Sequence, residues 1–304
     1  MVYRLRHCAR DLLCNALMGV PAVRQARLRR PRALTRSSPD LARTYWEQFA
    51  RLLEAVGPDR FSGGLVAEVG PGDAIPNGLL ALAMGARRYI AIDRFLGDIT
   101  GPIARGLYRD VLAYAPPCML EGLRSRGLDP EDFPWDQGDG RPPVLELRSE
   151  GLEWLSTHRA PRVDLLFSIA TLEHLLDVPS ALCAMGDLVV PGGTVYHEVD
   201  YGPHADWGSY ANPLSFLAVP DRLWRLSGSN RGMPNRFRHS ELMHSLALSG
   251  FRCEATIGRR CTPDQVEALR PKLLPRFRHL PSVDLQVLSA TIVGTREADA
   301  QPLT

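Results

Sequence analysis

The chain has 304 residues, of which 45% are hydrophobic and 23% are charged, and these ordinary proportions argue against a largely disordered protein. No uncharged apolar run reaches the roughly 18 residues of a membrane-spanning helix, so no transmembrane helix is expected. The net charge of +2 is uneven, because residues 1–36 carry nine arginines and one aspartate (+8) while the rest of the chain is −6. An acidic body argues against a broad nucleic-acid groove, and no nucleic-acid partner is expected.

Residues 1–40 differ from the rest in charge and contain three prolines, and we interpret them as a basic N-terminal extension. Three alternatives remain for residues 1–36: a helix packed on the core, a solvated tail, or a peripheral contact with a membrane or an acidic partner. An arginine-rich run stands where a signal peptide would need small residues, so we expect a cytoplasmic protein, with peripheral membrane contact as an alternative. A partial apolar stripe favours an amphipathic helix and consists of Leu5, Leu12, Leu13 and Leu17.

The pattern from residue 41 onwards is that of an α/β protein. A first helix is predicted from Leu41 to a stop at Gly57-Pro58. Short apolar runs then alternate with helical stretches, which predicts a parallel sheet covered by helices on both faces. The apolar runs are Leu65–Ala67, Leu79–Met84, Tyr89–Ile92, Val144–Leu147, Val163–Phe167, Thr194–Tyr196, Phe251–Thr256 and Val287–Val293.

Two segments are longer than the usual connection in such folds, residues 97–143 and residues 201–238. The second is rich in aromatic residues, asparagine and arginine, and we expect it to form a cap over a substrate. The main domain is predicted to span residues 41–296 and to be followed by a flexible tail, residues 297–304. The six cysteines show no zinc-ligand spacing and are expected to be reduced thiols.

A glycine-rich segment follows the first apolar run, where a strand should turn into a helix. Gly70 and Gly72 let the backbone approach a ligand closely. Asp93 ends the next predicted strand, 23 residues beyond Gly70, where a carboxylate can accept hydrogen bonds from ribose hydroxyls. The pattern indicates an adenosine-bearing cofactor. A nicotinamide fingerprint would need a third glycine where Ile75 stands, which disfavours a dehydrogenase without removing that alternative.

These segments together resemble class I S-adenosylmethionine-dependent methyltransferases of the small-molecule kind. The first motif and second-strand acid are Glu68-Val69-Gly70-Pro71-Gly72-Asp73 and Ala91-Ile92-Asp93, and the later matches are 163–168, 172–175 and 191–193. The resemblance covers about residues 41–296. It implies a Rossmann-like, mostly parallel seven-stranded sheet with helices on both faces, and S-adenosylmethionine as the cofactor.

The resemblance also implies roles for individual cofactor residues. Gly70 and Gly72 should face the methionine portion and Asp93 the ribose, while Glu68 should orient the loop or meet the methionine ammonium. Ser168 should lie on the cofactor's side of the sheet. The candidates for the adenine site are Ser149 and Glu150, and the two aromatic residues that could close over the methionine end, or lie in the core, are Tyr45 and Trp46.

Candidate bases follow the predicted fifth strand. A base is needed when the methyl acceptor is a hydroxyl, since the hydroxyl must lose its proton. His204 is the first choice because it lies just past the strand, Asp200 could orient or charge it, and His197, within the strand, fits a buried hydrogen-bonding role better.

The pair Glu173-His174 resembles the same pair in ubiquinone-pathway O-methyltransferases, some of which use a further upstream glutamate to bind a metal. Ala170 stands at that upstream place here, so no metal is predicted, and His174 is assigned to substrate binding with a structural role as the alternative. Arg236 and Arg238 could hold an anionic or polyhydroxylated acceptor, or could brace the acidic body.

The predicted function is methyl transfer to a small-molecule or glycan-like acceptor, at a hydroxyl oxygen. A non-catalytic S-adenosylmethionine-binding regulator and a nicotinamide-dependent dehydrogenase are the alternatives. No Asn/Asp-Pro-Pro-Tyr segment of the base-methylating type follows the fourth strand, where Ser168-Ile169-Ala170-Thr171 stands instead.

Overall fold

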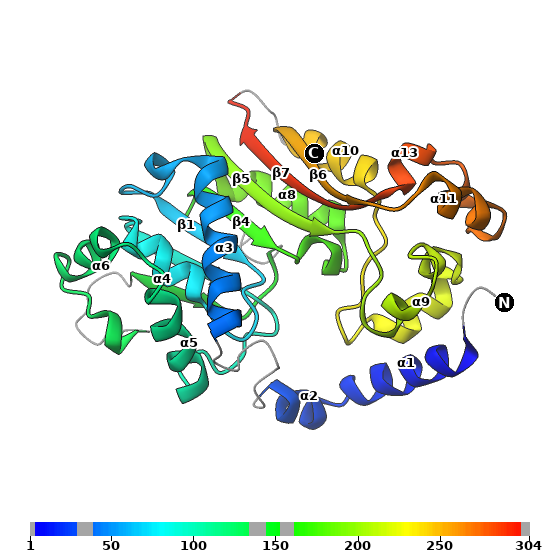
Figure 1. Ribbon diagram of the computed structural model, residues 1–304, viewed down its shortest axis with the longest axis horizontal. Helices are drawn as coiled ribbons and strands as arrows, with labels where there is room; N and C mark the ends of the chain where they lie inside the picture. Colours follow the sequence, from blue (N-terminus) through cyan, green and yellow to red (C-terminus); the bar gives the residue numbers. More distant parts are fainter. Residues whose placement is uncertain (1–3, 29–38, 134–143, 153–160, 299–304) are drawn as a thin grey trace.

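A seven-stranded sheet forms the centre of the molecule in the computed structural model, which describes residues 4–28, 39–133, 144–152 and 161–298 (Figure 1). The strand order is β3-β2-β1-β4-β5-β7-β6; β7 runs antiparallel to β5 and β6, and the other pairs are parallel. This is the mostly parallel sheet that the sequence predicts. The strands are β1 (Leu65–Val69), β2 (Arg88–Ile92), β3 (Leu145–Arg148), β4 (Val163–Ile169), β5 (Val189–Asp200), β6 (Phe251–Arg260) and β7 (Val287–Arg296).

Helices cover both faces of the sheet, because successive strand residues point to opposite sides and both sides are apolar. Val66 belongs to one hydrophobic cluster, and its neighbours Leu65 and Ala67 belong to the other. The first cluster is completed by α3 (Pro39–Val56), α4 (Pro76–Ala83), α5 (Pro102–Leu112) and α6 (Pro117–Arg124). The second is completed by α8 (Val178–Leu188) and α10 (His239–Leu248).

The apolar run Leu79–Met84 belongs to a helix and not to a strand. All eight residues of α4 are buried and seven of them are apolar, so this helix shows no amphipathic pattern. Gly78 makes the close packing possible, since a Cβ at this position would lie 2.4 Å from the ring of Tyr89. The glycine therefore sets how closely α4 approaches β2.

A third hydrophobic cluster lies outside the two sheet faces. It combines the segment between β5 and α10 with the segment between β6 and β7, so the predicted cap, residues 201–238, has a partner that the sequence analysis did not identify. Trp207, Phe216 and Trp224 come from the first segment, and Leu269 and Phe277 from the second. The helices involved are η5 (Ala205–Ser209), η6 (Ser215–Ala218), α9 (Asp221–Gly228), α11 (Pro263–Leu269), η7 (Arg270–Lys272), α12 (Pro275–Arg278) and α13 (Ser282–Leu285).

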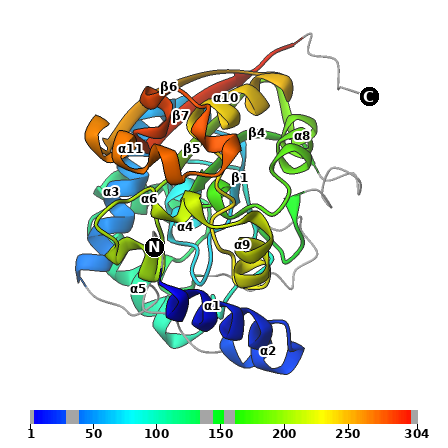
Figure 2. The same cartoon turned by 90° about the vertical axis from the view of Figure 1, so that its right-hand side faces the viewer.

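The N-terminal extension forms α1 (Leu5–Met18) and α2 (Pro21–Leu28), and α1 packs along α9 (Figures 1 and 2). Asp11 is buried there and accepts hydrogen bonds from Trp207 Nε1 at 3.2 Å and from Arg231 at 2.8 Å. Asn15 donates to the Leu226 carbonyl at 2.9 Å. One face of α1 is thus tied to the cap by polar contacts. Within the described ranges, no helix has the length and apolar character needed to cross a membrane.

Candidate active site

The loop after β1 has the backbone shape that its glycines predict. Gly70 and Gly72 have φ of 77° and 76°, a left-handed conformation that other residues avoid. The two positions differ in their surroundings. A Cβ at Gly70 would lie 2.2 Å from Thr171 Oγ1, whereas a Cβ at Gly72 would meet no atom within 4 Å. Gly70 therefore packs against the turn after β4, and the backbone at Gly72 is open to a ligand.

Asp93 holds this loop in place at the end of β2. One carboxylate oxygen accepts a hydrogen bond from the Gly72 N–H at 2.8 Å, and the other accepts one from the Phe95 N–H at 2.7 Å. Each carboxylate oxygen can accept a second bond, and Asp93 is only half-buried. The predicted role at a ribose is compatible with this geometry, and the structure adds a second role in joining the loops after β1 and β2.

Glu68 lies in the core at the end of β1. Its carboxylate accepts hydrogen bonds from Asn77 Nδ2 at 3.0 Å and from the hydroxyl of Tyr89. Burial raises the pKa of Glu68 to about 7, although both hydrogen bonds act in the opposite direction. The side chain connects β1 to α4 and β2, and its role in orienting the loop or meeting the methionine ammonium stays a prediction.

Ser168 and His197 form a buried pair on neighbouring strands. They lie opposite each other in the register of β4 and β5, and Ser168 Oγ is 2.8 Å from His197 Nδ1. Neither side chain has exposed surface, and burial lowers the pKa of His197 to about 3. The structure therefore corrects the inclusion of His197 among the candidate bases, because an imidazole enclosed in the sheet cannot contact an acceptor.

Ser149 and Glu150 follow β3 at the same edge of the sheet. The carbonyl of Arg148, the residue before them, accepts a hydrogen bond from the Asp93 N–H at 2.9 Å. The predicted adenine residues thus start beside the predicted ribose residue, with Ser149 exposed and Glu150 half-buried.

Tyr45 lies within electrostatic reach of Glu68 and Asp73, and burial raises its pKa. Tyr45 and Trp46 are both half-buried, and both pack against the first hydrophobic cluster. Two roles were open for these aromatic residues, contact with the cofactor or packing in the core. The packing of both residues fits the core role.

A polar cluster stands beside this region, at the ends of β4 and β5. We call Glu173, His174, Asp200 and His204 the acceptor cluster. The His174 and His204 rings are 4.9 Å apart, His204 Nε2 is 3.7 Å from an Asp200 carboxylate oxygen, and the Asp200 N–H donates to Glu173 at 3.3 Å. Arg259 also contacts Asp200, at 3.0 Å. Two sequence-predicted residues, His204 and Asp200, are thus brought together with His174.

Burial dominates the electrostatics of the acceptor cluster. It lowers the pKa of His174 to about 4 and also lowers the pKa of His204, where Asp200 acts in the opposite direction. It raises the pKa of Glu173 to about 8. Both imidazoles are therefore neutral near pH 7 and have nitrogen lone pairs available.

Asn235 positions one side of the acceptor cluster and was not identified from the sequence. Its N–H donates to the Glu173 carbonyl at 2.6 Å, and its side chain donates to the carbonyls of Leu172 at 2.7 Å and Leu175 at 3.2 Å. The turn η4 (Leu172–His174) is thereby fixed to the segment before α10. One asparagine in a polar segment carries no local signal of such a contact.

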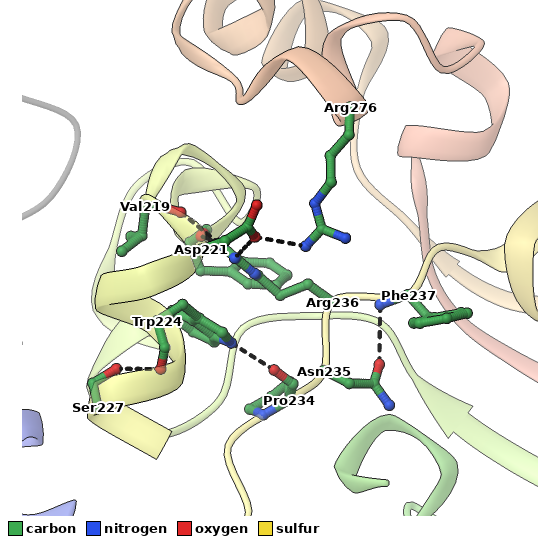
Figure 3. Close-up of polar contacts among 10 residues, drawn as sticks. Val219, Asp221, Trp224, Ser227, Pro234, Asn235, Arg236, Phe237 and Arg276 are labelled. Atoms are coloured by element: carbon green, nitrogen blue, oxygen red, sulfur yellow. Dashed lines mark hydrogen bonds and ion pairs between the residues drawn. The ribbon is translucent and has the colours of Figure 1, made fainter. Parts of the chain in front are cut away.

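Arg236 and Arg238 are buried and bonded to the protein itself, which corrects their predicted role in substrate binding. Arg236 is 3% exposed; it donates to the carbonyls of Phe216 and Val219, at 3.2 and 2.6 Å, and pairs with Asp221 (Figure 3). Arg238 is fully buried and donates to the carbonyls of Tyr201, Leu285 and Val287. Both guanidinium groups satisfy backbone carbonyls where the irregular cap segments enter the interior.

No family model matches the chain, and no curated protein matches it in sequence. Its structure is similar to a putative S-adenosylmethionine-dependent methyltransferase from Listeria monocytogenes, with 11% identity, 83% of this chain and 97% of that chain covered, and a TM-score of 0.42. A methyltransferase of this kind from Mesorhizobium loti has 15% identity, coverages of 83% and 97% and a TM-score of 0.40. The N-methyltransferase NodS from Bradyrhizobium japonicum, in complex with S-adenosyl-L-homocysteine, has 13% identity, coverages of 84% and 87% and a TM-score of 0.38.

The fold itself is established by the sheet. Five parallel strands in the order β3-β2-β1-β4-β5 reverse their direction of progression between β1 and β4, and the chain then adds an antiparallel strand, β7, between β5 and β6. The glycine loop and the end of β4 meet at this reversal, where ligands bind in open α/β sheets. With this order and these strand directions, the chain has the Rossmann-like α/β fold that the sequence predicts.

Proposed function

We propose that the protein transfers a methyl group from S-adenosylmethionine to a small-molecule or glycan-like acceptor, at a hydroxyl oxygen. The observation that carries the proposal is the loop of Gly70 and Gly72, which Asp93 holds at the carboxyl ends of the parallel strands. The open backbone at Gly72 suits the approach of a cofactor, and Asp93 retains acceptor capacity for ribose hydroxyls.

The cofactor would supply a methyl group made electrophilic by its sulfonium. Two features of the acceptor cluster support a hydroxyl acceptor. His204 is neutral near pH 7 because burial lowers its pKa, so it can take the proton that the hydroxyl loses. Asp200, at 3.7 Å, would stabilise the resulting imidazolium. The cluster lies at the ends of β4 and β5, next to the turn that packs on Gly70, so both reactants would bind at one edge of the sheet.

Calorimetric titration of the purified protein tests the cofactor. We expect binding of S-adenosylmethionine and S-adenosylhomocysteine and none of NAD. Asp93→Ala should weaken binding about 100-fold, since it removes two hydrogen bonds to a charged acceptor. Asp59→Ala, an exposed aspartate on η2 (Pro58–Arg60), is the control and should bind normally. Because Asp93 also holds the loop, circular dichroism and thermal unfolding must show that the variant is folded.

NAD binding in place of S-adenosylmethionine would replace the proposal with a dehydrogenase. Incubation with S-adenosylmethionine and fractionated metabolites, followed by mass spectrometry, tests for methyl transfer. A methylated product whose formation is lost in His204→Ala supports a role of the acceptor cluster in the transfer. Cofactor binding without any methylated product, across acceptors with hydroxyl, amine and carboxyl groups, would identify a binding protein instead of an enzyme.

A further inference from the structure

Three side chains of the acceptor cluster bring metal-binding atoms together. Glu173, His174 and His204 each offer one donor atom, and these atoms lie within 4.8 Å of one another. Glu173 Oε2, His174 Nδ1 and His204 Nε2 are buried and have no hydrogen-bond partner within the described ranges. A buried polar atom without a partner costs about 1–3 kcal/mol. Three neighbouring side chains that each carry such an atom are compatible with a ligand that binds all three residues.

The chemistry of the three donors selects the ligand. Two imidazoles and one carboxylate are a ligand set of catalytic zinc sites and also suit other divalent transition metals, while calcium and magnesium prefer oxygen ligands. We propose that Glu173, His174 and His204 bind one divalent transition-metal ion, with zinc as the first candidate. Ala170 stands where an upstream ligand would be needed, but His204, thirty residues after His174, completes the set.

The surroundings are those of a supported metal site. The Gly232 backbone makes a hydrogen bond with the His174 ring, as the second nitrogen of a ligating histidine commonly does. The Asn235 N–H fixes Glu173 through its carbonyl at 2.6 Å. In a tetrahedral zinc site with bonds of about 2.0–2.1 Å, the ligand atoms lie about 3.4 Å apart. The donor atoms of the three side chains, which lie within 4.8 Å of one another, would have to move closer by about 1 Å on metal binding.

The metal would also change the proposed methyl transfer, and this step alone rests on that proposal. An acceptor hydroxyl that occupies the open fourth position loses its proton more readily. His204 then serves as a ligand, and Asp200 accepts the proton. The acceptor oxygen forms its bond to the methyl carbon as the carbon–sulfur bond breaks, and the bonding electrons remain on sulfur.

Metal binding is tested on the full chain without the methyl-transfer assay. After treatment with a chelator, the protein is titrated with Zn²⁺ by calorimetry and with Co²⁺ by visible absorption. We expect one Zn²⁺ per chain and a tetrahedral Co²⁺ spectrum without the intense thiolate bands that cysteine ligands produce. His204→Ala, His174→Ala and Glu173→Gln should each weaken binding at least about 100-fold. His244→Ala, an exposed histidine on α10, is the matched control.

Several outcomes would overturn the proposal: no stoichiometric binding, thiolate bands in the Co²⁺ spectrum, or equal affinity in the control and the three ligand variants. Glu173→Gln keeps the size and shape of the side chain, so it guards against a result caused by misfolding, and its thermal unfolding is compared with that of the wild type. S-adenosylmethionine affinity should stay unchanged in Glu173→Gln. Loss of metal with intact cofactor binding therefore separates this proposal from the proposed function.

Discussion

At the scale of single residues, burial decides what the charged groups near the glycine loop can do. Glu68 accepts hydrogen bonds from two donors, but it lies in the core, and burial raises its pKa to about 7. The guanidinium group of Arg238 is fully enclosed and donates to the backbone carbonyls of Tyr201, Leu285 and Val287. The same residue types on the surface would be ready to bind a ligand. A charged residue in a motif is therefore a ligand contact only if the fold leaves it accessible.

Glu68→Gln should change how stability depends on pH. The pKa of Glu68 is raised in the folded protein, so its protonated form stabilises the fold below about pH 4.5 and this contribution is lost as the pH rises to about 7. Glutamine does not ionise. Between pH 5 and pH 8, the free energy of unfolding of the variant should therefore rise by up to about 3 kcal/mol relative to that of the wild type. Urea unfolding at four pH values measures this gain.

The exposed Glu54 on α3 supplies the control for that comparison. Glu54→Gln should follow the wild type across the same pH range, because the Glu54 side chain lies on the surface and is not enclosed in the core. A constant difference between Glu68→Gln and the wild type at all pH values would contradict the assigned role of burial.

At the scale of elements, the glycine loop and the turn after β4 form one unit. Gly70 packs against Thr171, and Ala170, the preceding residue, has a φ of 51°, which is unusual for a residue with a side chain. The Ala170 N–H donates to the Glu198 carbonyl at 2.8 Å and thereby ties the turn to β5. The arrangement of the glycine loop therefore depends on the ends of β1 and β4 and on β5.

Gly70→Ala should destabilise the protein by about 2 kcal/mol more than Gly72→Ala. Both substitutions place a side chain at positive φ, which costs about 1–2 kcal/mol. Only Gly70→Ala also forces a methyl group into Thr171, and such overpacking costs about 1–3 kcal/mol. Urea unfolding of the two variants measures the difference. Adding Thr171→Ala to Gly70→Ala should recover part of the loss, and failure to recover any would place the strain elsewhere.

The elements that the sequence predicts well are those whose residues show a local pattern. The strands β1, β2 and β4 are short buried runs, and the positions of Gly70, Gly72 and Asp93 follow from strand ends alone. The helix α4 shows no amphipathic pattern because it is buried on all sides. The contacts of Asn235 and of the buried Arg238 join segments far apart in the chain, so no local sequence pattern predicts them.

At the scale of the whole molecule, one face of α1 packs against the third hydrophobic cluster. Cys8, Asp11 and Asn15 are buried against the cap, which agrees with the packed-helix alternative for residues 1–36. Leu5, Leu13 and Leu17 of α1 are exposed. Val20, directly before α2, and Val23, within α2, are also exposed. The arginines on these two helices are exposed, and Asp11, the acidic residue of α1, is buried. The exposed surface of the two helices thus combines apolar and positively charged groups.

An anionic membrane surface matches that exposed surface of α1 and α2, because apolar side chains insert at the lipid boundary and each arginine near the surface adds about 1 kcal/mol. We expect the full-length protein to sediment with phosphatidylserine-containing vesicles and less with phosphatidylcholine alone, and to be released by high salt. Leu13→Glu with Leu17→Glu should reduce sedimentation at least about tenfold without disturbing the buried face of α1. Leu248→Glu, an exposed leucine on α10, is the control and should sediment like the wild type. Equal sedimentation of all three proteins would assign α1 a purely structural role in holding the cap.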